Sequence, residues 1–112
     1  MQHSVIHDTE RHRFVVRELG HEAYLEYYEL PDGLLDYSHT YTPNEIRGRG
    51  IATAIIRSAL EYARAHGKQV VPSCPFVQTY ADRHQEYAPV IAERWRHTTD
   101  RPRAAEEAPC DG

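Results

Sequence analysis

Six consecutive residues in the middle of the sequence combine glycine and positive charge at the point where a helix is predicted to begin. They are Arg47, Gly48, Arg49, Gly50, Ile51 and Ala52. The first turn of a helix exposes unpaired backbone amides and about half a positive charge, and glycine lets the backbone approach an anion closely. We therefore predict that residues 47–52 bind a phosphate or pyrophosphate. The alternative is an ordinary glycine-rich connection with solvated arginines.

A cysteine at the start of a second predicted helix could carry out nucleophilic chemistry. Cys74 directly precedes Pro75, and proline is favoured in the first turn of a helix. The helix dipole stabilises negative charge there and so favours a thiolate. His39, on a predicted strand, is a candidate base that could also orient Cys74. Cysteine is equally often a small buried residue, and a lone strand histidine is more often structural, so these roles stay open.

Three runs rich in aromatic and β-branched residues precede the phosphate-binding loop. They cover residues 12–19, 22–30 and 34–42, and the turn-forming residues Gly20 and Gly33 lie between them. Alternation is visible in the second run, where Ala23, Leu25 and Tyr27 share one face while Glu26 and Tyr28 share the other. The pattern predicts an antiparallel meander with one packed face.

The strongest helical pattern begins at Ile51 and ends before Gly67. Its apolar residues recur at helical spacing, namely Ile51, Ala52, Ile55, Ile56, Ala59, Leu60 and Ala63. Residues 69–71 then read as a short buried strand, which completes a β-α-β unit. Because a mixed sheet with helices results, the predicted class is α+β or α/β.

A second helix is predicted from Pro75, with a stripe formed by Phe76, Val77, Tyr80, Ala81 and His84. A last short helix is predicted from Pro89 to about Trp95. Residues 1–11 and 96–112 lack a periodic pattern, so we expect a flexible N-terminus, a single domain over residues 12–95 and a disordered tail.

The composition limits the class of protein. The chain has 112 residues and a formal net charge of −4, which argues against a general nucleic-acid binder. It has neither a run of about 18 apolar residues nor a signal-peptide layout, so we expect a cytoplasmic protein without a membrane partner. Cys74 and Cys110 stand in different surroundings, which argues against a structural disulfide, and the eight histidines lack zinc-site spacing, so we expect no metal.

The phosphate-binding loop and the residues around it resemble one known family. Arg47-x-x-Gly50-x-Ala52 matches the acyl-CoA signature Gln/Arg-x-x-Gly-x-Gly/Ala of the GNAT superfamily. Around it stand Ser38-His39-Thr40, Pro43, Glu45, Val70-Val71-Pro72, Cys74-Pro75-Phe76-Val77, Tyr80, Arg83-His84 and Glu86-Tyr87. This set of residues resembles the small single-domain GNAT-like N-acetyltransferases with a Cys-Pro-Phe motif, over roughly residues 11 to 90.

The resemblance implies a minimal GNAT-like fold and a coenzyme A site. The pyrophosphate of coenzyme A would lie on the amides of residues 48–52. The pantetheine arm would run between the strand containing Thr40, Tyr41 and Thr42 and the strand ending at Ser73. Acetyl-CoA would be the cosubstrate, and the reaction would be acetyl transfer to a small-molecule or protein amine.

The resemblance also implies catalytic roles. The thioester would point toward Cys74, which could form an acetyl-cysteine or leave the amine to attack directly. In larger GNAT enzymes a tyrosine placed comparably to Tyr80 protonates the departing thiolate, although Tyr80 could equally be a packing residue. His39 is the best candidate for the base. Tyr41 stands where the family usually has an acidic residue, which weakens any role for a carboxylate there, although Glu45 is near in sequence.

Two other classes of function stay open. One is a non-catalytic acyl-CoA-binding module, which would keep the loop but tolerate loss of Cys74, His39 and Tyr80. The other is a protein or nucleic-acid interaction domain, which would not bind coenzyme A. The acceptor amine cannot be read from the sequence, and monomer and homodimer are both compatible with so short a chain.

Overall fold

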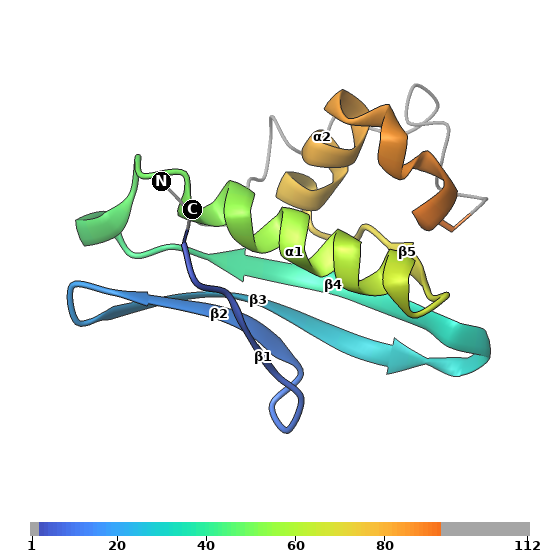
Figure 1. The fold of residues 1–112 in the computed structure, drawn as a ribbon, viewed down its shortest axis with the longest axis horizontal. Coiled ribbons are helices and arrows are strands. Elements are labelled where there is room, and N and C mark those ends of the chain that lie inside the picture. The colour runs from blue at the N-terminus through green and yellow to red at the C-terminus, as the bar shows by residue number, and fades with distance from the viewer. Residues whose placement is uncertain (1–2, 93–112) are drawn as a thin grey trace.

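The computed structural model describes residues 3–92 and contains a five-stranded mixed sheet with two α-helices on one side of it (Figure 1). The strands lie side by side in the order β1-β2-β3-β4-β5. The first four pair antiparallel, and β5 pairs parallel with β4. Their bounds are Ile6–Asp8, Arg13–Glu18, His21–Leu30, Leu34–Tyr41 and Gln69–Val71. The predicted meander and mixed α+β architecture are therefore confirmed.

Strand β3 shows why the sheet has one packed face. Ala23, Leu25 and Tyr27 are buried, whereas Glu26 and Tyr28 are exposed, as the alternation predicts. The β2–β3 hairpin closes through a two-residue turn in which both central residues have positive φ, the arrangement whose twist matches that of the strands.

Helix α1, Ile51–Ala65, packs its apolar stripe on the sheet. It contacts β2, β3, β4 and β5, and its buried residues are Ile51, Ile55, Ile56, Ala59, Leu60 and Ala63. Helix α2, Pro75–Arg83, begins at the expected proline and buries Val77 and Ala81. Within residues 3–92, no helix is both long and apolar enough to cross a membrane.

Strands β4 and β5 separate after a short region of pairing. β5 pairs with β4 only from Leu34 to Asp36, and the chain then turns away toward α2. A β-bulge lies just beyond, because Tyr27 pairs with Tyr37 while Glu26 pairs with His39. Ser38 is therefore the extra residue, and its hydroxyl donates to the Glu26 carbonyl at 3.2 Å. Bulges bend a strand and redirect its side chains.

Two segments differ from the sequence-based expectation. Residues 1–11 were expected to be flexible, but Ile6–Asp8 form β1 and pair with β2. The last helix was predicted to begin at Pro89, but a 3-10 helix covers Gln85–Val90 instead and contains that proline. Ile91 then bridges to Val70 of β5, because the open edge of β5 offers backbone hydrogen bonds to an extended chain. Trp95 and the predicted tail lie outside the described residues.

Short 3-10 helices also cover Pro31–Gly33 and Asn44–Ile46.

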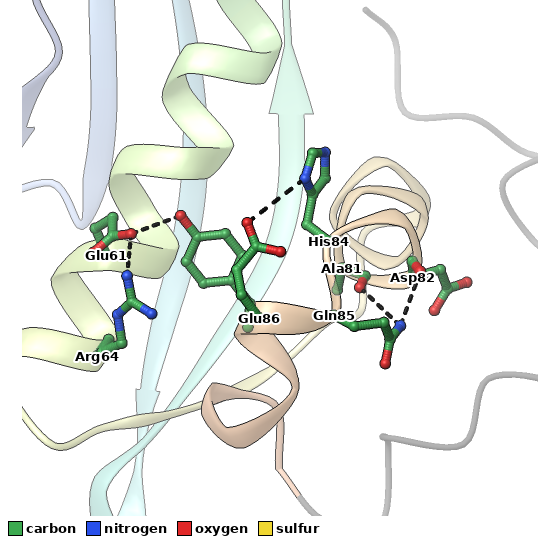
Figure 2. A network of polar contacts seen from close by, with 8 residues as sticks. Glu61, Arg64, Ala81, Asp82, His84, Gln85 and Glu86 are labelled. Carbon is green, nitrogen blue, oxygen red and sulfur yellow. Dashed lines mark hydrogen bonds and ion pairs between the residues drawn. The ribbon is translucent and has the colours of Figure 1, made fainter.

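The segment after α2 is attached to α1 by a polar contact (Figure 2). Tyr87 is almost fully buried, and its hydroxyl donates to Glu61 Oε2 at 2.7 Å. Arg64 also binds Glu61 and places its guanidinium over the Tyr87 ring. Hydrogen bonds from Arg64 and Tyr87 lower the pKa of Glu61, while burial and Glu61 raise the pKa of Tyr87 to about 12.

Replacing Tyr87 with phenylalanine should lower the free energy of unfolding by about 1 kcal/mol at pH 7, because one hydrogen bond to a carboxylate is lost. The Glu61 pKa is lower in the folded protein than its ordinary 4.5, so this contribution is present above pH 4.5 and is lost as the pH falls through the folded pKa. Urea unfolding at pH 7 and pH 3 measures both. A Tyr28→Phe control, at an exposed tyrosine, should change neither value.

Candidate functional site

The loop that precedes α1 adopts the conformation that its glycines permit. Gly48 and Gly50 have φ of 81° and 78° and flank Arg49. Gly50 is the N-cap of α1, and its carbonyl accepts the Ala54 amide at 3.1 Å. L-residues with a Cβ adopt this backbone region only with strain, so glycine at both positions lets the loop take this conformation at low cost. Ile46 is fully buried before the loop and fixes its start in the core.

The two arginines of the loop are held by different elements. Arg47 donates through Nε to the Thr42 carbonyl at 3.1 Å, which ties the loop to the end of β4. Arg49 donates through Nη1 to Glu18 Oε2 at 3.3 Å, which ties the loop to the end of β2. About half of the Arg49 side chain is exposed. The Arg49 guanidinium also lines a cavity with Gly50, the N-cap of α1, where the helix dipole favours anions.

This cavity has a volume of about 420 Å³ and opens beside the first turn of α1. Its lining is polar and basic, and consists of His3, Arg49, Gly50, Thr53, Ala54, Arg57 and Ser58. Arg49 and Gly50 are the two predicted loop residues that line it. Two guanidinium groups and two hydroxyl groups in one cavity can bind phosphate oxygens, because arginine and hydroxyl donors match that geometry.

Of the three residues predicted to lie along the ligand, Thr40 and Tyr41 belong to β4 and Thr42 directly follows it. Thr40 and Thr42 are buried at 2% and 4% exposure. Tyr41 is half-buried, and its ring lies 5.6 Å from that of Tyr24 between centroids. Thr40 and Tyr41 occupy the part of β4 that has no pairing with β5 among the described residues.

Cys74 and His39 lie on opposite faces of β4. The Cys74 sulfur is fully buried and lies 3.4 Å from Thr40 Oγ1, whereas His39 alternates with Thr40 and packs near Tyr24 on the other face. The Cys74 amide donates to the Tyr37 carbonyl at 3.0 Å.

The structure records Cys74 as disulfide-bonded, and the second sulfur lies outside the described residues. This contradicts the expectation of no disulfide. That expectation rested on sequence neighbours, which do not determine the distant sulfur that a cysteine meets.

Tyr80 lies on α2 with its ring stacked on His84 at 4.0 Å between centroids. Burial raises the pKa of its hydroxyl, and the Arg57 guanidinium partly offsets that rise. The phenol is therefore neutral at physiological pH and keeps a proton to donate. It packs against the core, as the stripe of α2 predicts.

Six residues at the candidate site were not predicted from the sequence, namely His3, Glu18, Thr53, Ala54, Arg57 and Ser58. His3, Glu18 and Arg57 contact the loop or line the cavity beside it. Helical spacing could have predicted that Arg57 lies near the loop, because Arg57 is two turns after Gly50 on the exposed side of α1. No sequence signal pointed to His3 or Glu18. In the part of the chain that the structure describes, no group of three or more His, Cys, Asp or Glu side chains could hold a metal ion.

A known protein family matches most of the chain. The family model of the GCN5-related N-acetyltransferases matches residues 13–90, which include strands β2 to β5, the loop and both α-helices. The chain belongs to the GCN5-related N-acetyltransferase family. This confirms the resemblance predicted from the loop and its surroundings.

Curated relatives and one solved structure are similar to the same region. Protein NATD1 of Gallus gallus is 35% identical over 78 residues, which cover 68% of this chain and 71% of that protein. Protein NATD1 of Homo sapiens is also 35% identical, over 69% of its length. The NMR structure of a GCN5-like putative N-acetyltransferase from Staphylococcus aureus superposes with a TM-score of 0.63 at 19% identity and covers 80% of this chain and 87% of that one. This last likeness shows the fold.

Proposed function

We propose that this chain is an acetyl-CoA-dependent N-acetyltransferase that transfers an acetyl group to a small-molecule or protein amine. The observation that carries the proposal is the loop before α1. Its two left-handed glycines flank Arg49, and the loop opens into a basic cavity. Family membership supplies the reaction class, because its members use acetyl-CoA as cosubstrate.

The loop and the cavity fit the phosphate-bearing end of coenzyme A. A Cβ built on Gly50 meets no atom within 4 Å, so open space lies over this turn of the backbone. Residues 48–52 would bind the pyrophosphate through backbone amides. Arg57, Thr53 and Ser58 would bind the remaining phosphate from the side of α1.

The free part of β4 fits the pantetheine arm. β5 pairs with β4 only up to Asp36, so the backbone from Ser38 to Tyr41 lacks a strand neighbour on that side among the described residues. Peptide-like amides of a ligand can pair with such an edge as an added strand would. Thr40, Tyr41 and Thr42 are then the residues along which the ligand would lie.

The positions of the catalytic candidates favour direct attack by the amine. Cys74 is fully buried against Thr40, and this environment supports a packing role. His39 lies on the partly exposed face of β4 just after the bulge, where it could accept the proton of an approaching amine. Tyr80 holds its proton to high pH and is the candidate donor to the departing thiolate.

Direct attack predicts that no acetyl group accumulates on Cys74. Intact-protein and peptide mass spectrometry of the reduced protein, after mixing with acetyl-CoA without an acceptor, should show an unmodified Cys74 peptide. Cys74→Ala should bind coenzyme A about as well as the wild type. An acetyl adduct confined to Cys74, lost in Cys74→Ala, would replace this account with a ping-pong scheme.

The proposed function is tested by turnover with a panel of amines that includes polyamines, aminoglycosides and lysine peptides. Free thiol release and the acetylated amine should appear together in equal amounts. Binding of acetyl-CoA without release of thiol for any amine would favour the non-catalytic acyl-CoA-binding module. Absence of binding would favour an interaction domain.

A further inference from the structure

We infer that His3 is a positioning residue for the phosphate-binding loop and that its protonation tightens the binding of coenzyme A. This inference rests on the proposed function. His3 lies three residues before β1, and its side chain is 11% exposed. It forms part of the cavity wall beside α1. The segment that leads into β1 starts beside the first turn of α1 (Figure 1).

Both ring nitrogens of His3 face hydrogen-bond acceptors. Nδ1 lies 3.0 Å from Glu18 Oε1, and Nε2 lies 2.8 Å from the Arg49 carbonyl oxygen. A neutral imidazole carries one N–H and can donate to one of these oxygens, and its other nitrogen then points a lone pair at an acceptor. The imidazolium ion donates to both. The observed geometry is therefore satisfied by the protonated form.

These contacts fix the loop at its most flexible point. Arg49 stands between Gly48 and Gly50, which give the backbone the widest choice of conformations. His3 holds the Arg49 carbonyl, while Glu18 holds the Arg49 guanidinium through its other oxygen at 3.3 Å. One carboxylate thus connects the N-terminal segment, the end of β2 and the loop.

The charges around His3 give the sign of the effect. Glu18 faces His3 from β2, Arg49 faces it from the loop, and Arg57 lines the same cavity from α1. The Glu18 carboxylate repels a negatively charged ligand in the cavity. A positive charge on His3, in addition to that on Arg49, reduces this repulsion. Protonation of His3 therefore both completes the loop contacts and makes the cavity more positive. Imidazole is the side chain whose charge ordinarily changes between pH 5 and 8.

The test is a calorimetric titration with coenzyme A at several pH values between 5.5 and 8.5, with wild type and His3→Ala measured in parallel. The phosphate monoester of the ligand also titrates in this range, but its effect is common to both proteins. The ratio of the two affinities therefore isolates the contribution of His3 to the pH dependence. Wild type should bind about tenfold more tightly than His3→Ala at pH 5.5, the value of one hydrogen bond to a charged group, and the ratio should fall toward unity by pH 8.5.

The Glu18→Gln variant gives a second test, because its affinity for coenzyme A should depend on pH in a way that a merely structural role of His3 would not produce. The glutamine amide can donate to Nδ1 of neutral His3, whose Nε2–H then donates to the Arg49 carbonyl. The requirement for the imidazolium ion disappears, so affinity at pH 8.5 should be at least that of wild type and the profile should flatten. His12→Ala is the matched control, because His12 also lies near a glutamate, Glu29 at 3.9 Å, but does not contact the loop.

The outcomes separate this inference from the proposed function. Tight binding with parallel pH profiles for wild type, His3→Ala and Glu18→Gln overturns the inference and leaves the coenzyme A site intact. A wild-type protein that does not bind coenzyme A overturns both. If His3→Ala does not fold, the pH dependence of coenzyme A affinity in Glu18→Gln is compared with that of wild type, and this comparison alone tests the inference.

Discussion

Replacing Gly50 with valine should lower the affinity for acetyl-CoA about 30- to 100-fold. Gly50 has φ of 78°, a region that costs an L-residue about 1–2 kcal/mol and a β-branched residue more. The valine side chain would also occupy the open space over the first turn of α1, where the phosphate must approach the backbone. Calorimetric titration measures the affinity.

Gly33→Val is the matched control for this prediction. Gly33 has φ of 76° and, like Gly50, has no atom within 4 Å of a built Cβ. It lies in the turn between β3 and β4, so valine there imposes the same backbone strain away from the loop. Gly33→Val should lose a similar amount of stability and keep its affinity. If the two variants bind acetyl-CoA equally well, the loop is not the phosphate site.

Replacing Phe14 with alanine should lower the free energy of unfolding by about 3–5 kcal/mol, a large part of the roughly 5–15 kcal/mol typical of a domain. Phe14 of β2 is 2% exposed, pairs with His7 of β1 and Leu25 of β3, and contacts Tyr62 of α1. Its ring stacks on His7 at 4.2 Å between centroids and contacts the rings of Tyr27, Tyr37 and Tyr62. Removing it leaves a cavity that such rigid rings cannot close.

Urea unfolding followed by circular dichroism measures this loss. Tyr28→Ala removes an aromatic ring of similar size from the exposed face of β3, where 64% of the residue is accessible, and should change stability by no more than about 0.5 kcal/mol. Equal losses in the two variants would contradict the assignment of the packed face of the sheet.

The central elements could be predicted because their sequence patterns are strong. The stripe that begins at Ile51 is long enough to determine a helix and the face that it buries. Strand β1 could not be predicted, because it has three residues and its one aliphatic residue, Ile6, faces solvent. β1 is held by its pairing with β2, by the stacking of His7 on Phe14 and by the hydrogen bond between His7 and Tyr27, and periodicity reveals none of these contacts.

The backbone conformation of the candidate site could be predicted from its glycines, whereas contacts between side chains from distant segments could not. Gly48 and Gly50 adopt the left-handed conformation that their residue type permits. His39 and Thr40 are consecutive strand residues and so lie on opposite faces of β4, and the structure puts Cys74 beside Thr40. The contact of His3 with Arg49 spans 46 positions of sequence and has no motif.

The most direct test of the central claim is a calorimetric titration of the reduced, purified protein with acetyl-CoA and with coenzyme A in modest salt. The proposed site predicts saturable binding at one site per chain for both ligands, weakened by added salt because phosphate and arginine charges form much of the contact. Absence of saturable binding by either ligand would contradict the acyltransferase account and leave the loop as a structural connection between β4 and α1.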